Sequence, residues 1–173
     1  MKAAVLIVDD SPSARRMLSI NLRAIGFSVD EASDGAEGYS KAILGAFDLI
    51  ITDGNMPNMS GAEFIRRFRA HPSGRDVSII FVSARSDEYA KREAKAAGAI
   101  GWLIKPFYRR QLLSEIKRVA DMTCHDSRLG MLVEHHVSRA GQQGDVMRQT
   151  RAPLSSAGKL TCTQTGNAFR LCP

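Results

Sequence analysis

The sequence has little of what marks a secreted, membrane-spanning or zinc-binding protein. Its three cysteines form no CxxC pair, and their odd number argues against a disulfide framework. No apolar stretch approaches the roughly 20 residues that a membrane span needs. The apolar run near the start ends at Val8 and is followed at once by Asp9 and Asp10, so it is too short for a secretory signal peptide. We therefore expect a cytoplasmic protein with free thiols and no membrane insertion.

A glycine-rich turn is also lacking after this first run, where VDDSPSA stands, and this argues against a nucleotide-binding domain. The formal net charge of +6 is compatible with nucleic acid binding. The lysines and arginines are, however, scattered over several predicted helices, so we expect no direct contact with nucleic acid. We interpret Arg66, Arg67 and Arg69 as a solvent-exposed helix face.

Residues 1–120 alternate between short apolar runs and amphipathic stretches. The apolar runs are rich in Val, Ile or Phe, and three of them are nearly continuous, as expected of strands covered on both faces. They predict strands at 3–8, 27–31, 48–52, 78–82 and 101–104.

Five amphipathic stretches predict helices after these strands. The first has Ser11 as its N-cap, Pro12 at its first position and Gly26 as its stop. The second covers about 35–44, and the others begin at a capping box at Ser60, near Ser86 and after Pro106. Five βα units in strict alternation imply an α/β domain with a doubly wound, five-stranded parallel sheet.

Residues 121–173 differ in composition from residues 1–120. They hold all three cysteines and three of the four histidines, in a spacing that fits no familiar zinc ligand pattern. An apolar stripe predicts a short amphipathic helix at about 127–140, and we expect disorder in the remainder. The chain is thus divided into a domain at 1–120 and a mostly disordered C-terminal tail at 121–173.

Polar side chains stand at the carboxyl ends of four predicted strands. Asp9 and Asp10 follow the first strand, Asp53 closes the third, Ser83 follows the fourth and Lys105 closes the fifth. Each alone is best explained as a helix cap or turn residue. Because the ligand crevice of an open parallel sheet lies at these ends, their conjunction favours a functional site.

This set of residues has a definite chemistry. Three clustered carboxylates raise one another's pKa unless a cation joins them, and oxygen ligands suit Mg²⁺ (or Mn²⁺). A carboxylate can also act as a nucleophile and form an acyl phosphate. Lys105 could then balance the charge of one phosphoryl oxygen, and Ser83 could donate a hydrogen bond to another.

Four stretches, VDDS (8–11), DLIITDGNMPNMSG (48–61), FVSA (81–84) and GWLIKPF (101–107), resemble the receiver domains of response regulators in two-component signalling. The resemblance covers residues 3–120 and is strongest to the single-domain chemotaxis type. It implies a flavodoxin-like (βα)5 fold with Asp53 as the phosphoacceptor. It also implies that the metal ligands are Asp9, Asp10, Asp53 and the backbone carbonyl of Asn55.

The resemblance further implies that Ser83 and Lys105 sense the phosphoryl group and that Trp102 occupies the aromatic switch position, where Tyr or Phe is commoner. Period-two alternation puts Trp102 on the opposite face of its strand from Lys105. We therefore expect Trp102 to respond through Ser83 and the loop after it, without touching the phosphoryl group.

The function implied is that of a switch with weak autodephosphorylation, not a conventional enzyme. A histidine kinase would supply the phosphoryl group, and a downstream protein would bind the face around the fourth helix, fifth strand and fifth helix. A haloacid-dehalogenase-like phosphatase is one alternative, but it needs a second Asp where Asn55 stands. The other is a transcription factor with a truncated output region at 121–173, which is short and lacks a two-helix pattern.

Overall fold

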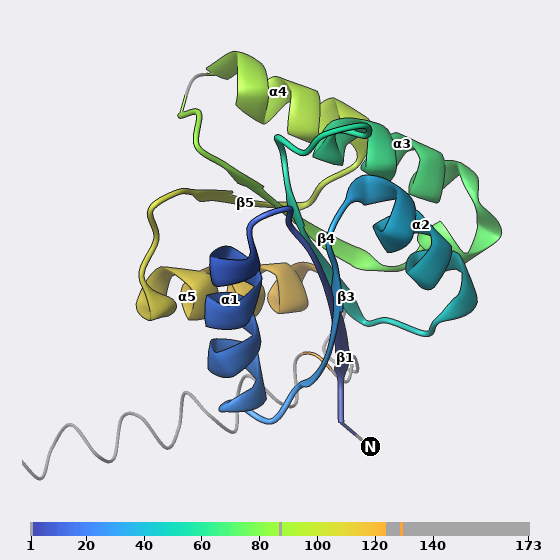
Figure 1. The fold of residues 1–173 in the computed structure, drawn as a ribbon. Coiled ribbons are helices and arrows are strands. Elements are labelled where there is room, and N and C mark those ends of the chain that lie inside the picture. Colours follow the sequence, from blue (N-terminus) through green and yellow to red (C-terminus); the bar gives the residue numbers. More distant parts are fainter. Residues whose placement is uncertain (1, 87, 124–128, 130–173) are drawn as a thin grey trace, which may run out of the picture.

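Five parallel strands form one sheet in the computed structural model of the chain, with the strand order β2-β1-β3-β4-β5 (Figure 1). The structure describes residues 2–86, 88–123 and 129. The strands are β1 (Ala4–Val8), β2 (Ser28–Ala32), β3 (Leu49–Asp53), β4 (Ser78–Ser83) and β5 (Gly101–Ile104). The strand order reverses between β1 and β3, so the ligand crevice of this fold class lies at their carboxyl ends.

Helices cover both faces of the sheet (Figure 1). They are α1 (Pro12–Arg23), α2 (Gly35–Leu44), α3 (Gly61–Ala70), α4 (Glu88–Ala97) and α5 (Arg109–Met122), with a short 3₁₀ helix, η1 (Pro72–Gly74). Ser11 caps α1 by accepting the Ala14 N–H, and Ser60 caps α3 by accepting the Glu63 N–H. The predicted doubly wound fold is confirmed, with strand ends within about one residue of prediction.

The sheet separates two hydrophobic cores, and successive residues of one strand serve different cores. In β1, Val5 and Ile7 belong to the core that includes residues of α1 and α5, whereas Leu6 and Val8 belong to the core that includes residues of α2, α3 and α4. In β5, Leu103 lies in the first core and Trp102 packs against the second. This confirms the predicted alternation in β5, and it explains the continuous apolar runs of the strands.

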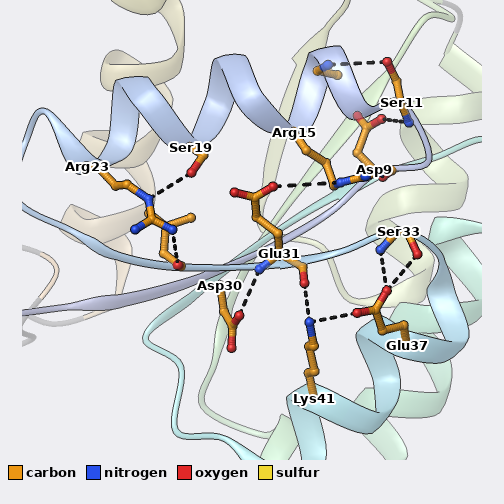
Figure 2. A network of polar contacts seen from close by, with 12 residues as sticks. Asp9, Ser11, Arg15, Ser19, Arg23, Asp30, Glu31, Ser33, Glu37 and Lys41 are labelled. Atoms are coloured by element: carbon orange, nitrogen blue, oxygen red, sulfur yellow. Dashed lines mark hydrogen bonds and ion pairs between the residues drawn. The ribbon is translucent and has the colours of Figure 1, made fainter.

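The edge strand β2 is covered by charged side chains of its neighbouring helices (Figure 2). Arg23 of α1 donates to the backbone carbonyl of Val29 at 2.8 Å, and Lys41 of α2 donates to that of Glu31. Lys41 also pairs with Glu37 at 2.8 Å, which, with hydrogen bonds from Ser33, lowers the pKa of Glu37 to about 2.

The opposite edge strand, β5, is covered in the same way by α5. Glu115 accepts the Trp102 N–H at 2.7 Å, and Arg118 donates to the Ile100 carbonyl at 2.8 Å. Arg118 and Glu115 also pair with each other at 2.6 Å. At each edge, two of the backbone groups that an added strand would use are therefore already bonded to side chains.

The three arginines of α3 do not form one solvent-exposed face, and the expectation is wrong for Arg69. Arg66 and Arg67 are exposed and pair with glutamates at the surface. Arg69 instead donates to the carbonyls of Gly98, Val77 and Gly74. The contact joins residues far apart in the sequence, which a helix pattern alone does not reveal.

Beyond Thr123, the C-cap of α5, the structure describes Leu129 alone, which is buried in the core that α1 and α5 cover. The rest of the predicted helix at about 127–140, the predicted disorder after it and the cysteines and histidines of the tail lie outside the described residues. The domain boundary at residue 120 stays a prediction. Within the described part of the chain, no helix has the length and apolar character to cross a lipid bilayer.

Candidate functional site

The carboxyl ends of four strands bring most of the predicted site residues to one edge of the sheet. Asp9 and Asp10 directly follow β1, Asp53 is the last residue of β3, and Lys105 directly follows β5. Ser83 is the last residue of β4 rather than the first residue after it. Because the sheet is parallel throughout, these positions lie on the same side of the molecule.

Three carboxylates and one ammonium form the centre of the site. Oxygen atoms of Asp9, Asp10 and Asp53 lie within 4.8 Å of one another. The Lys105 Nζ lies 2.8 Å from Asp9 Oδ2 and 2.8 Å from Asp53 Oδ1. Asp9 and Asp53 are buried, and Asp10 is exposed at the mouth of the cluster. The donor set consists only of oxygens, which fits a hard divalent cation such as Mg²⁺.

Asp9 is held in place at both its side chain and its backbone (Figure 2). Its Oδ1 accepts the N–H of Ser11 at 2.9 Å, and its backbone carbonyl accepts a hydrogen bond from Arg15 Nη1 at 2.6 Å. Arg15 also lies 3.9 Å from a carboxylate oxygen of Glu31 on β2. The first turn of α1 therefore fixes the end of β1. Sequence reasoning missed Arg15, because nothing in a helix pattern shows which residue faces back toward a strand end.

The electrostatics of Asp53 are set by competing effects. Burial raises the pKa of Asp53 above its usual value, and the negative charge of Asp9 adds to this rise. The Lys105 ammonium and the Asn55 N–H, which donates to Asp53 Oδ2 at 3.3 Å, act in the opposite direction. One cation, the Lys105 ammonium, is thus shared between the buried carboxylates of Asp9 and Asp53.

Lys105 is the positively charged partner of the two buried carboxylates. Burial acts to lower its pKa, but the hydrogen bonds and charges of Asp53 and Asp9 outweigh burial, and its pKa is raised. The ammonium therefore stays charged at neutral pH.

The start of α3 approaches the backbone of Asp53 so closely that position 61 has room only for glycine. A Cβ at Gly61, the first residue of α3, would lie 2.1 Å from the carbonyl oxygen of Asp53, so no other residue fits there without movement. The N–H of Gly61 donates to the carbonyl of Gly54 at 3.2 Å. These contacts were not predicted, because they depend on how α3 crosses the end of β3.

The remaining predicted site residues surround the cluster. Ser83 is buried, and its Oγ accepts the N–H of Arg85 at 3.0 Å. Asn55 is exposed, two residues after Asp53. Trp102 is outside the carboxylate cluster, and its ring stacks on Phe81 with 5.3 Å between the ring centroids.

The sequence matches known proteins over the same region. The family model of the response regulator receiver domain matches residues 5–117. Over 116 residues the chain is 34% identical to the chemotaxis protein CheY of Pseudomonas aeruginosa, covering 66% of this chain and 94% of that protein. Over 101 residues it is 40% identical to a gliding motility regulatory protein of Myxococcus xanthus, covering 58% of this chain and only 13% of that protein.

Solved structures agree with these matches. The chemotaxis protein CheY4 of Vibrio cholerae is 42% identical, with a TM-score of 0.67, and the match covers 69% of this chain and 99% of that chain. The receiver domain of the sensor histidine kinase PA1611 of Pseudomonas aeruginosa, which has a magnesium ion coordinated in its active-site cleft, is 28% identical. Its TM-score is 0.65, and the match covers 70% of this chain and 99% of that chain. The chain therefore belongs to the response regulator receiver domain family of two-component signalling.

Proposed function

We propose that Asp53 accepts a phosphoryl group from a histidine kinase and that the protein signals through the resulting change of shape. The observation that carries this proposal is the position of the Asp53 carboxylate, which ends β3 beside Asp9 and 2.8 Å from the Lys105 ammonium. The haloacid-dehalogenase alternative is not favoured, because Asn55 cannot act as the general acid that such a phosphatase needs two residues after its nucleophile.

The chemistry assigned to each residue follows from its place. A carboxylate oxygen of Asp53 attacks phosphorus, the bond from phosphorus to the donor breaks, and an acyl phosphate forms. Lys105 then lies near the added negative charge and can pair with a phosphoryl oxygen, and Ser83 supplies a hydroxyl donor. Attack by water on the same phosphorus returns the Asp53 carboxylate and releases inorganic phosphate, which is the weak autodephosphorylation.

A divalent cation, Mg²⁺ or Mn²⁺, would be held by Asp9, Asp10, Asp53 and the backbone carbonyl of Asn55. When bound, it would neutralise charge on the phosphoryl oxygens. Support comes from the oxygen-only donor set and from the magnesium ion in the related receiver domain. The exposed position of Asp10 leaves the cluster accessible to an ion from solvent.

The downstream partner would bind the face formed by α4, β5 and α5. This face carries a groove of about 530 Å³ that is lined by Trp102 and small apolar residues, by the cations Lys91, Lys95 and Arg118, and by one carboxylate, Glu115, which pairs with Arg118. A protein segment with apolar and acidic side chains would match this lining. The proposal implies a cytoplasmic protein, because the kinase and such a partner would act on it there.

The test is phosphorylation of Asp53 by a small-molecule phosphodonor in the presence of Mg²⁺. We expect one acid-labile phosphoryl group per chain, detected by intact mass. Asp53→Asn should abolish it, since an amide is not a nucleophile here. Asp34→Asn is the matched control, because Asp34 caps α2 and Asn caps a helix equally well. Undiminished labelling of the Asp53→Asn protein would refute the assignment.

A further inference from the structure

Phe81 lies between the backbone that follows Asp53 and the ring of Trp102. Thr52, Phe81 and Trp102 are register partners on three adjacent strands, so their side chains share one face of the sheet. Phe81 is 4% exposed, and its ring and that of Trp102 are stacked with an interplanar angle of 14°. The stack is therefore a direct contact between a buried ring and a half-buried one.

The edge of the Phe81 ring lies against Gly54. A Cβ at Gly54 would lie 2.5 Å from Cζ and 2.6 Å from Cε1 of Phe81, closer than real Cβ atoms come to a neighbour. The ring thus fills the space that any side chain at position 54 would need. Gly54 is itself fixed on both sides, because its N–H donates to the Val82 carbonyl at 2.7 Å and its carbonyl accepts from Gly61 at 3.2 Å.

We propose that Phe81 is a positioning residue that couples Asp53 to Trp102 through Gly54. This inference rests on the proposed phosphorylation of Asp53. A phosphoryl group on Asp53 and a cation on its neighbours change the forces on the peptide that joins Asp53 to Gly54. Close-packed interiors transmit such displacements, because they hold few voids that could absorb them. Movement of Gly54 therefore displaces the Phe81 ring, and the stacked Trp102 ring follows.

This route differs from the one predicted through Ser83. Ser83 acts on the loop after β4, where its Oγ holds the N–H of Arg85. Phe81 acts within the sheet, two residues earlier on the same face of β4, and needs no movement of that loop. The two routes can be separated by substitution, because Phe81 is an apolar residue outside the carboxylate cluster.

The experiment uses the fluorescence of Trp102, the single tryptophan of the chain, and the NMR signal of its indole N–H. Each signal is recorded with and without beryllofluoride and Mg²⁺, and the difference between the two states is compared between variants at matched occupancy of Asp53. Phe81→Leu should reduce this difference to less than half of the wild-type value. Phe68→Leu is the matched control, because Phe68 is equally buried in the same core but stacks on Phe64. It should retain the wild-type difference.

A second pair of variants tests the contact itself. Gly54→Ala places a methyl group against the ring, so the Trp102 signal should shift without beryllofluoride. Adding Phe81→Leu to Gly54→Ala should remove most of this shift, because leucine leaves room for the methyl group. If Gly54→Ala fails to fold, the comparison of Phe81→Leu with Phe68→Leu still decides whether Phe81 couples Asp53 to Trp102.

Failure of the proposed function and failure of the coupling through Phe81 would give different results. If the small phosphodonor does not label Asp53 in the wild-type protein, the proposed function fails. If Asp53 is labelled and Phe81→Leu retains the full difference in the Trp102 signal, the coupling through Phe81 is overturned and the phosphoacceptor role stands.

Discussion

Replacing Arg69 should destabilise the protein far more than replacing its two arginine neighbours on α3. Its guanidinium donates to the Gly98 carbonyl at 3.1 and 2.9 Å and to the Val77 carbonyl at 2.8 Å, and it also donates to the Gly74 carbonyl. Gly98 directly follows α4, and a Cβ there would lie 3.0 Å from the Arg69 Cγ. One side chain thus joins α3, η1, the start of β4 and the end of α4.

The magnitude follows from the number of acceptors. Three carbonyls lose a charged donor in Arg69→Ala, and each lost bond is worth roughly 1 kcal/mol in a half-buried setting where water replaces part of it. We expect a loss of about 3 kcal/mol in the free energy of unfolding. Arg69→Lys keeps the charge and the stem, but one ammonium cannot match the planar fork and should recover about half of this loss.

The assay is equilibrium unfolding in urea, with Arg66→Ala and Arg67→Ala as controls. Their side chains are 54% and 56% exposed, and each pairs with a surface glutamate, so each change should be at most about 0.5 kcal/mol. If Arg69→Ala is no more destabilising than Arg67→Ala, its hydrogen bonds contribute no net stability and the reasoning is wrong. If Arg69→Lys equals wild type, the fork geometry is irrelevant.

Three further predictions concern the metal site, the β5 edge and the tail. Mg²⁺ should raise the melting temperature by binding only the folded state, and Asp10→Ala or Asp9→Asn should weaken this effect; an unchanged Mg²⁺ titration in both variants would count against the carboxylate cluster as the site. Glu115→Gln should lower the free energy of unfolding at pH 7 by roughly 1 kcal/mol, because burial of Glu115 is outweighed by its hydrogen bonds and its folded-state pKa is lowered. Because its pKa is lowered on folding, the charged Glu115 stabilises the fold at pH values above its unfolded-state pKa, and this stabilisation disappears as the pH falls through its folded-state pKa. The free energies of unfolding of the two proteins should therefore converge in acid; a difference that is constant with pH would show that the charge of Glu115 is not involved. Truncation after Ala120 should retain the fold and the labelling of Asp53, with a loss of about 2 kcal/mol from the buried Leu129; an unfolded product would place the domain boundary beyond Ala120.

The fold could be predicted because its determinants are local. Strands covered on both faces give apolar runs such as β4, which is buried throughout, and caps such as Ser60 mark where helices begin. The site could be predicted in outline for a related reason. A parallel sheet brings every strand end to one edge, so the order of residues along the chain is enough to gather Asp9, Asp53 and Lys105.

The contacts that could not be predicted are those between elements that are not joined in the sequence. Arg69 lies 29 residues before Gly98, and its side-chain direction depends on how α3 and α4 pack. The contact of Phe81 with Gly54 depends on a ring rotamer and on the path of the loop after β3. A periodic pattern gives the face of a residue but not its partner, which is why Arg69 was assigned to the surface.

If the protein signals to a downstream partner as proposed, the contacts at both sheet edges limit how that partner could bind. A partner that added a strand at β5 would have to displace Glu115 from the Trp102 N–H and Arg118 from the Ile100 carbonyl, leaving two charged groups without these bonds. The backbone of Trp102 is thus held by α5 from outside the sheet. Its ring is free of that restraint, is half-buried and lies in the lining of the groove between α4 and α5. On the proposed function, a change at Asp53 would therefore be presented to a partner by the position of this ring, and a partner that recognises the ring would need no opening of the sheet.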